Sequence, residues 1–194
     1  LAPGEYRDGL RLHHLAGEAG RPITVAESRN IEQRVRDSML SIARDDAKLA
    51  MANLARLRAA DLPPAEKIRH HVTGIIHAYY KRPYLNRLLQ KLIREGTPEA
   101  AEEVSKFFVQ PVAEARSEII AEGIKAGVFR EVDSRLIGYA LEGACSQIFT
   151  SSASREAVLG NGELNIELVD RYAKSTADLI VGGLMARPDN QGDS

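Results

Sequence analysis

Apolar residues recur at three- and four-residue spacings along most of this chain, and this pattern constrains the fold more than any other feature. From Ile31 onward the spacing matches one face of successive helices, and no segment shows strand-like alternation. The first long helix is expected from about Ile31 to Ala60. It should end before Leu62-Pro63-Pro64, because proline disfavours helix in the residue before it. We therefore predict an all-α fold.

Prolines and glycines set the expected limits of the later helices. Pro64 can serve as the first residue of the second helix, which runs to Arg82-Pro83, and a shorter helix follows and ends at Gly96. Thr97-Pro98-Glu99 has the cap, proline and acid that mark a helix start. Pro111 lies inside the helix that follows, so we expect a kink there or a helix broken in two.

The remaining stretches have weaker signals. Residues 1–30 are rich in glycine and proline and are expected to form an irregular head. Residues 151–162 should form a small-residue loop with one weak turn. The last helix should run from about Asn165 to Met185, and residues 188–194 should form a disordered tail.

The segment from Ile119 to Asp133 indicates a helix that stops and restarts. Gly127 suits the left-handed residue just past a helix end, because it has no Cβ to clash there. Asp133 can accept backbone N–H bonds at the start of the next helix. The turn predicts two helices packed at an angle.

Composition excludes several classes of protein. The 194 residues are enough for one helical domain with a sizeable core. A net charge of −1 tells against a chain that is mainly a nucleic-acid-binding module. The single cysteine, Cys145, is expected to be a small buried hydrophobe. No run of residues is long and apolar enough to span a membrane and no leader opens the chain, so we expect a cytoplasmic protein.

No motif indicates catalysis, a metal or a cofactor. The sequence has no nucleophile elbow and no phosphate-binding glycine loop. His70 and His77 are seven residues apart, whereas chelation on a helix prefers a spacing of three or four. We therefore predict no catalytic residues, no metal site and no cofactor.

Aromatic residues concentrate in the middle helices. Such a cluster is often plain core, but a cavity for an apolar ligand needs the same bulky groups together with a few polar side chains that orient the ligand. We predict that six residues contact such a ligand: His77, Tyr80, Phe107, Phe108, Gln110 and Gln147.

The last two long helices carry small residues among large ones. Small residues let helices approach closely, and two such helices per subunit suit a four-helix dimer interface. Packing within one chain is the alternative. The predicted interface residues are Leu136, Ala140, Ala144, Ala173 and Ile180.

Several phrases resemble one family. They are Ala78-Tyr79-Tyr80-Lys81-Arg82-Pro83-Tyr84-Leu85-Asn86-Arg87-Leu88-Leu89, the segment from Ile119 to Asp133, and Leu136-Ile137-Gly138-Tyr139-Ala140-Leu141-Glu142-Gly143-Ala144-Cys145. From about Arg44 to Met185 the chain is similar to the C-terminal domain of TetR-type transcriptional regulators. The resemblance implies a TetR-like helical bundle and assigns residues 31–187 to ligand binding and dimerisation.

The head departs from this family. Leu15-Ala16-Gly17-Glu18-Ala19-Gly20 looks like the opening of the family's helix-turn-helix, but residues 21–27 do not continue the motif. The head is thus a possible remnant of a DNA-binding domain. The helix-turn-helix is absent, degenerate or incompletely represented.

The resemblance implies a transcriptional regulator, expected to be a repressor and a homodimer. A small, largely apolar effector would shift the long helix from about Ile31 to Ala60 and so change affinity for operator DNA. Two alternatives stay open. One is a ligand-binding and dimerisation module without its own DNA contact, and the other is a small α-helical enzyme that uses the tyrosine and histidine cluster.

Overall fold

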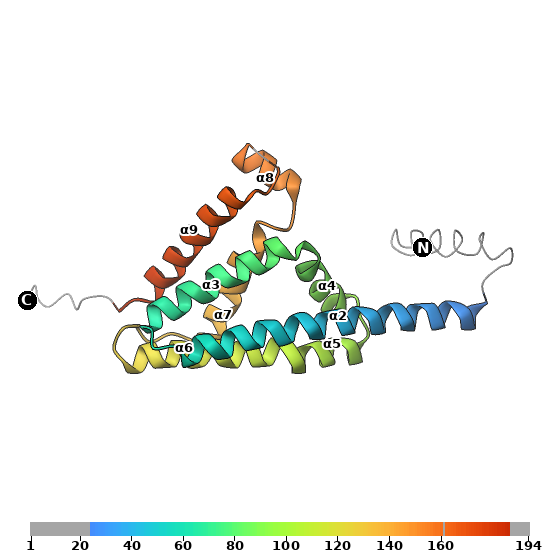
Figure 1. Cartoon of the computed structure of the whole chain (residues 1–194), viewed down its shortest axis with the longest axis horizontal. Coiled ribbons are helices and arrows are strands. Elements are labelled where there is room, and N and C mark those ends of the chain that lie inside the picture. Colours follow the sequence, from blue (N-terminus) through green and yellow to red (C-terminus); the bar gives the residue numbers. More distant parts are fainter. Residues whose placement is uncertain (1–23, 161, 187–194) are drawn as a thin grey trace, which may run out of the picture. The chain divides into compact units, whose positions relative to one another are not determined.

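The structure is a computed structural model that describes residues 24–160 and 162–186, and among these residues it is helical throughout, with no strand (Figure 1). This confirms the all-α prediction. The elements are α2 (Val25–Ala59), α3 (Pro64–Lys81), α4 (Pro83–Arg94), α5 (Pro98–Val104), the π-helical turn η1 (Ser105–Val109), α6 (Gln110–Lys125), α7 (Ser134–Gln147), α8 (Ser152–Leu159) and α9 (Ile166–Leu184).

Helix α2 begins at Val25, so the expectation that an irregular head extends to residue 30 is wrong for its last residues. The reason is a capping box at Thr24 and Glu27. The Glu27 backbone N–H donates to Thr24 Oγ1 at 3.2 Å, and the Thr24 backbone N–H donates to Glu27 Oε2 at 2.9 Å. These bonds satisfy donors that a helix start leaves free. Residues 1–23, with the possible helix-turn-helix remnant, and the tail 188–194 lie outside the described residues.

The chain divides into two compact units between Ile42 and Ala43, inside α2. The hydrophobic core cluster belongs to the second unit. This unit contains the last part of α2 and every later helix.

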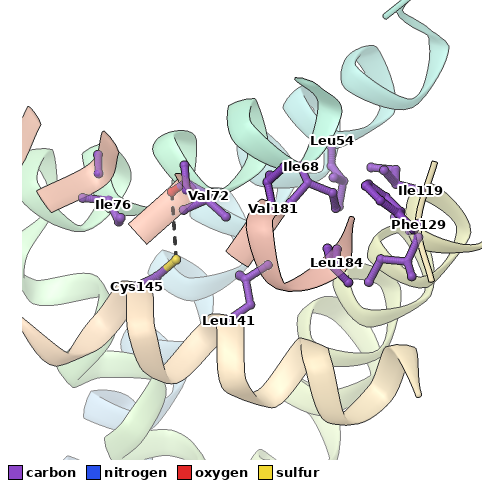
Figure 2. Close-up of a cluster of buried hydrophobic side chains, with 14 of the residues drawn as sticks. Leu54, Ile68, Val72, Ile76, Ile119, Phe129, Leu141, Cys145, Val181 and Leu184 are labelled. Atoms are coloured by element: carbon purple, nitrogen blue, oxygen red, sulfur yellow. Dashed lines mark hydrogen bonds between the residues drawn. The ribbon is translucent and has the colours of Figure 1, made fainter. Parts of the chain in front are cut away.

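The core of this unit is built on α3, which lies beside α9 and packs against α6 and α7 (Figure 1). Ile68, Val72 and Ile76 lie on one face of α3 and are fully buried (Figure 2). Cys145 of α7 is also fully buried, and its Sγ lies 3.9 Å from the carbonyl oxygen of Val72. Burial raises the pKa of the Cys145 thiol to about 12. Cys145 is therefore an inert core residue, as predicted.

The predicted stop and restart between α6 and α7 are confirmed. Gly127 has φ +69°, and the N–H of Val128 donates to the Gly123 carbonyl at 2.9 Å, which closes a Schellman motif at the end of α6. Asp133 then caps α7, because its Oδ1 accepts from the N–H of Arg135 at 2.9 Å.

The turn also fastens α6 to the end of α9. Phe129 is buried against Gly123, where a Cβ would lie 2.0 Å from the ring. On either side of Phe129, Arg130 N–H donates to Leu184 O at 2.9 Å and Ala186 N–H donates to Val128 O at 3.0 Å. The phenyl ring thus requires a glycine at position 123.

The predicted break near Pro111 is confirmed as the π-helical turn η1. Proline has no N–H to donate to Phe107 and its ring clashes with that carbonyl, so an unbroken α-helix is disfavoured. The N–H of Gln110 instead reaches back five residues to Ser105 O. Other predicted limits are also confirmed. Pro64 begins α3, Thr97 caps α5 and Asn165 caps α9.

Residues 152–159 form helix α8, so the predicted loop with one weak turn is wrong. Ser151 caps this helix by accepting from Ser154 N–H at 3.2 Å, and Gly160, with φ +69°, ends it. Arg155 fixes the helix to its flanks by donating to Ile148 O at 2.7 Å and to Gly162 O at 2.9 Å.

Candidate functional site

The second unit contains a cavity of about 470 Å³, within the range of small-molecule sites. Helices α2, α3, α4, α6, α7 and the turn η1 enclose it. Its lining residues are Asp46, Leu49, Ala50, Asn53, Leu54, Arg56, Leu57, Leu62, His70, His71, Gly74, Ile75, Ala78, Tyr79, Arg82, Leu85, Phe108, Val112 and Glu142.

The apolar wall of the cavity comes mainly from apolar residues at helical spacing on α2 and α3. Leu49, Leu54 and Leu57 lie on one side of α2, and Ile75 and Ala78 lie on α3. These spacings bring side chains of each helix to one face. An apolar ligand body would therefore be buried between two helices.

The turn η1 gives two neighbouring phenylalanines different surroundings. Phe108 lines the cavity, whereas the Phe107 ring lies under the Arg44 guanidinium, 5.9 Å from its centroid. Arg44 also pairs with Glu103 of α5. One turn thus contacts both the cavity and α2.

A buried polar network adjoins the cavity, and three of its residues, His71, Tyr79 and Glu142, belong to the lining and define what we call the polar end of the cavity. Arg116 of α6 donates from Nε to His71 Nε2 at 3.3 Å and from NH1 to Gly138 O at 2.6 Å. Its NH2 lies 3.7 Å from Glu142 Oε2. The Glu142 carboxylate also accepts a hydrogen bond from the Tyr79 hydroxyl. Arg116 thus connects α6 with α3 and α7.

Burial sets the protonation states in this network. Burial, assisted by the Arg116 charge, lowers the pKa of His71 to about 3, so its imidazole is neutral near pH 7. Burial and the neighbouring Glu142 raise the pKa of Tyr79, which keeps the phenol as a hydrogen-bond donor. Burial lowers the pKa of Arg116, yet a guanidinium stays protonated in proteins.

Among the remaining charged residues of the lining, Asp46 and Arg82 form an ion pair. Arg82 Nε lies 3.0 Å from Asp46 Oδ1, and Asp46 Oδ2 accepts from the Tyr84 hydroxyl at 3.1 Å. Arg56 donates to Asn53. The Asp46–Arg82 pair is thus balanced, whereas exposed Arg56 has a neutral partner.

The structure places one of the six predicted ligand residues, Phe108, on the cavity. Phe107 is on the Arg44 side of η1, and exposed Gln110 donates to Ser105 Oγ at 3.3 Å. The other three are absent from the lining. His77 Nε2 lies 2.8 Å from Asp170 Oδ1, Tyr80 packs against the core, and Gln147 is exposed.

Sequence reasoning did not select His71, Tyr79, Arg116 and Glu142 as site residues. A signal was present for one of them. Glu142 is a charged residue among small and apolar ones in a helix with a buried face, and such residues are rarely buried without partners. The partners come from other helices, so spacing along the chain did not reveal them.

The predicted dimer residues are divided between surface and core. Leu136 is 67% exposed and Ala140 is exposed, whereas Ala144 and Ile180 are half-buried. Ala173 is 1% exposed in the core of its own chain and has almost no area left for a partner. The structure adds two exposed apolar side chains on α7 and α9, Tyr139 at 81% and Leu179 at 72%.

The described part of the chain lacks two further kinds of feature. No three histidine, cysteine or acidic side chains there gather closely enough to hold a metal ion. No helix there has the length and apolar character needed to cross a bilayer.

The fold defines a class of all-α domain in which capped helices enclose a cavity beside α2. Residues 61–192 match the family model described as the tetracyclin repressor-like, C-terminal domain. Because the match covers more than half of the chain, the protein belongs to the TetR family of transcription regulators. Comparison with the curated proteins gave no match.

Two solved structures share this fold. The chain is similar to a Clostridium perfringens "putative fatty acid metabolism regulator", with a TM-score of 0.61 and 16% identity over 75% of this chain and 74% of that one. It is also similar to a transcriptional regulator of the TetR/AcrR family from Thermobifida fusca YX-ER1. There the TM-score is 0.60 and the identity is 19%, over 89% of this chain and 85% of that one.

Proposed function

We propose that this protein is a dimeric, cytoplasmic repressor that releases operator DNA when a small, largely apolar effector enters the cavity. The observation that carries the proposal is the cavity between α2 and α3. Helix α2 is continuous from Val25 to Ala59, and its residues from Asp46 to Leu57 line the cavity. A ligand there contacts the same helix that runs toward the N-terminal part of the chain.

The C-terminal end of α2 is anchored. Lys67 is 5% exposed, and its ammonium donates to Arg58 O at 3.1 Å and to the Glu122 carboxylate at 2.9 Å. This anchor supports a motion in which the cavity-facing part of α2 moves while its C-terminal end stays fixed. The effector acts by binding one of the two arrangements more tightly.

Exposed apolar side chains support the dimer. Leu136, Tyr139 and Leu179 project from α7 and α9, and at Gly143 and Gly182 on the same helices an added Cβ would have no neighbouring atom within 4 Å. Exposed large apolar side chains are a mark of interaction surfaces, and glycines permit close helix approach. A two-fold pairing of these helices would bury these side chains and close the assembly.

DNA binding is proposed from family membership. A gel shift with the full-length protein and the DNA upstream of its own gene tests it, with light scattering on the same sample. We expect a retarded band and the mass of a dimer. A monomer that retards no DNA fragment would contradict the proposal and favour a sensing module without its own DNA contact.

A further inference from the structure

One N–H of the largely buried His71, at the polar end of the cavity, has no protein partner among the described residues. His71 is 9% exposed and lines the cavity, and its Nε2 accepts a hydrogen bond from Arg116. A neutral imidazole that accepts at Nε2 carries its proton on Nδ1. Among the described residues, no hydrogen bond involves that N–H.

This N–H is not fully buried, and its residue lines the cavity. Every fully buried side-chain nitrogen and oxygen in the described ranges has a hydrogen-bond partner. His71 Nδ1 is therefore not enclosed by protein, and the open space beside His71 is the cavity. The site thus offers one donor to a ligand.

Glu142 offers the matching acceptor. Its carboxylate receives the Tyr79 hydroxyl and lies near the Arg116 guanidinium, and its side chain is 43% exposed and lines the same cavity. A carboxylate has about four acceptor positions, so it retains capacity for a ligand donor. His71 and Glu142 both contact Arg116, which places the donor and the acceptor at one end of the cavity.

Beside Arg116, neither sign of ligand charge finds an unpaired counter-charge. Glu142 and Arg116 balance each other, and the Arg116 N–H groups are directed at His71, Gly138 and Glu142. Elsewhere in the lining, Arg82 is paired with Asp46. Arg56, which donates to the neutral Asn53 amide, is exposed to solvent. Burying a further charge without a counter-ion is costly, whereas a neutral head that fills both bonds is not.

We propose that the effector is an apolar molecule whose head is uncharged and both donates and accepts a hydrogen bond, as in an alcohol, a phenol or a primary amide. Its head accepts from His71 Nδ1–H and donates to Glu142, and its body lies along Leu54, Ile75 and Phe108. This inference rests on the proposed function, since it takes the cavity as the effector site.

Three probes that share the same chain length of ten carbons but differ in head group test the proposal: 1-decanol, decanoate and decylammonium. Each is titrated calorimetrically into the intact protein, 1-decanol below its aqueous solubility and the two charged probes below their micellar concentrations. We expect 1-decanol to bind about tenfold more tightly than either charged probe, the usual scale for one well-matched hydrogen-bonded head. Equal or tighter binding of a charged probe overturns this inference and leaves the effector site standing, whereas no binding of any probe overturns both.

A charge variant sharpens the test. Glu142→Gln keeps an acceptor for Tyr79 but removes the anion beside Arg116, so decanoate should gain at least about tenfold relative to 1-decanol. Glu131→Gln removes the same charge from an exposed residue outside the lining and should leave the ranking unchanged. An unchanged ranking in Glu142→Gln overturns the assigned role. If that variant does not fold, the ranking of the three probes in the native protein still decides the matter.

Discussion

Arg116 shows how one buried cation fixes the positions of three helices. It extends from α6 to His71 on α3 and to Gly138 and Glu142 on α7, and its side chain is almost fully enclosed. Removing a partner from a buried charge costs several kcal/mol, because the charge is left without compensation. The same contacts that hold the helices together thus also set the polar end of the cavity.

The His71 imidazole makes stability depend on pH. Its pKa falls from 6.5 to about 3 on folding, so between these values the unfolded chain binds a proton that the folded chain does not. Its contribution is fully present above pH 6.5 and is lost as the pH falls toward 3, at up to about 1.4 kcal/mol per pH unit. In urea unfolding at several pH values, His71→Gln should flatten this slope. An equally steep slope in the variant would contradict the assignment.

At Gly123 an added side chain would have no room. In Gly123→Ala the new methyl would meet the Phe129 ring at 2.0 Å, so we expect a loss of about 1–3 kcal/mol in the free energy of unfolding. Gly74→Ala is the matched control. Gly74 also lies in a helix, but a Cβ added there would have no neighbouring atom within 4 Å. Alanine is the better helix former, so this variant should be as stable as native or slightly more stable. Similar losses in both variants would show that Phe129 is not the cause.

At the scale of single elements, local sequence signals predicted most of the helices. Gly127, Asp133 and Pro111 act on their own turns, so their effects could be inferred without knowledge of the fold. The start of α2 at Val25 was missed because the Thr24–Glu27 capping box was not recognised. Helix α8 was missed because small polar residues have weak propensity, and caps and Arg155 stabilise it instead.

The turn η1 predicts unequal roles for two adjacent phenylalanines. Phe108→Ala removes part of the cavity wall and should weaken 1-decanol binding about five- to tenfold, since several buried carbons lose their contacts. Phe107→Ala removes a ring that lies under Arg44 and should leave binding within about twofold. Calorimetry on both variants checks this. Equal effects would mean that η1 does not separate the two side chains in solution.

At the scale of the whole molecule, the cavity could not be predicted residue by residue. His77, Tyr80, Gln110 and Gln147 are polar groups near aromatic residues in the sequence, yet none of them lines the cavity. The polar end instead unites residues up to 71 positions apart, from His71 to Glu142. Which face of each helix turns inward depends on packing between helices, and that information is not local.

A substitution that introduces one charge tests the proposed dimer interface. Leu179→Glu places a carboxylate on the exposed apolar surface of α9 and should give a monomer at micromolar concentration, because burying an unpaired charge opposes association. Ile93→Glu introduces the same change at a 42% exposed position on α4 and should remain dimeric. Light scattering gives the mass, and circular dichroism confirms that both variants fold. A dimeric Leu179→Glu would place the interface elsewhere.

The central claim is that the cavity and operator DNA compete through α2, and thermodynamic linkage tests it most directly. The affinity of the full-length protein for DNA from its own promoter is measured by fluorescence anisotropy, without and with saturating 1-decanol. We expect the ligand to weaken DNA binding at least about fivefold, and DNA to weaken 1-decanol binding by the same factor. A DNA affinity that stays unchanged while 1-decanol is bound would contradict the account.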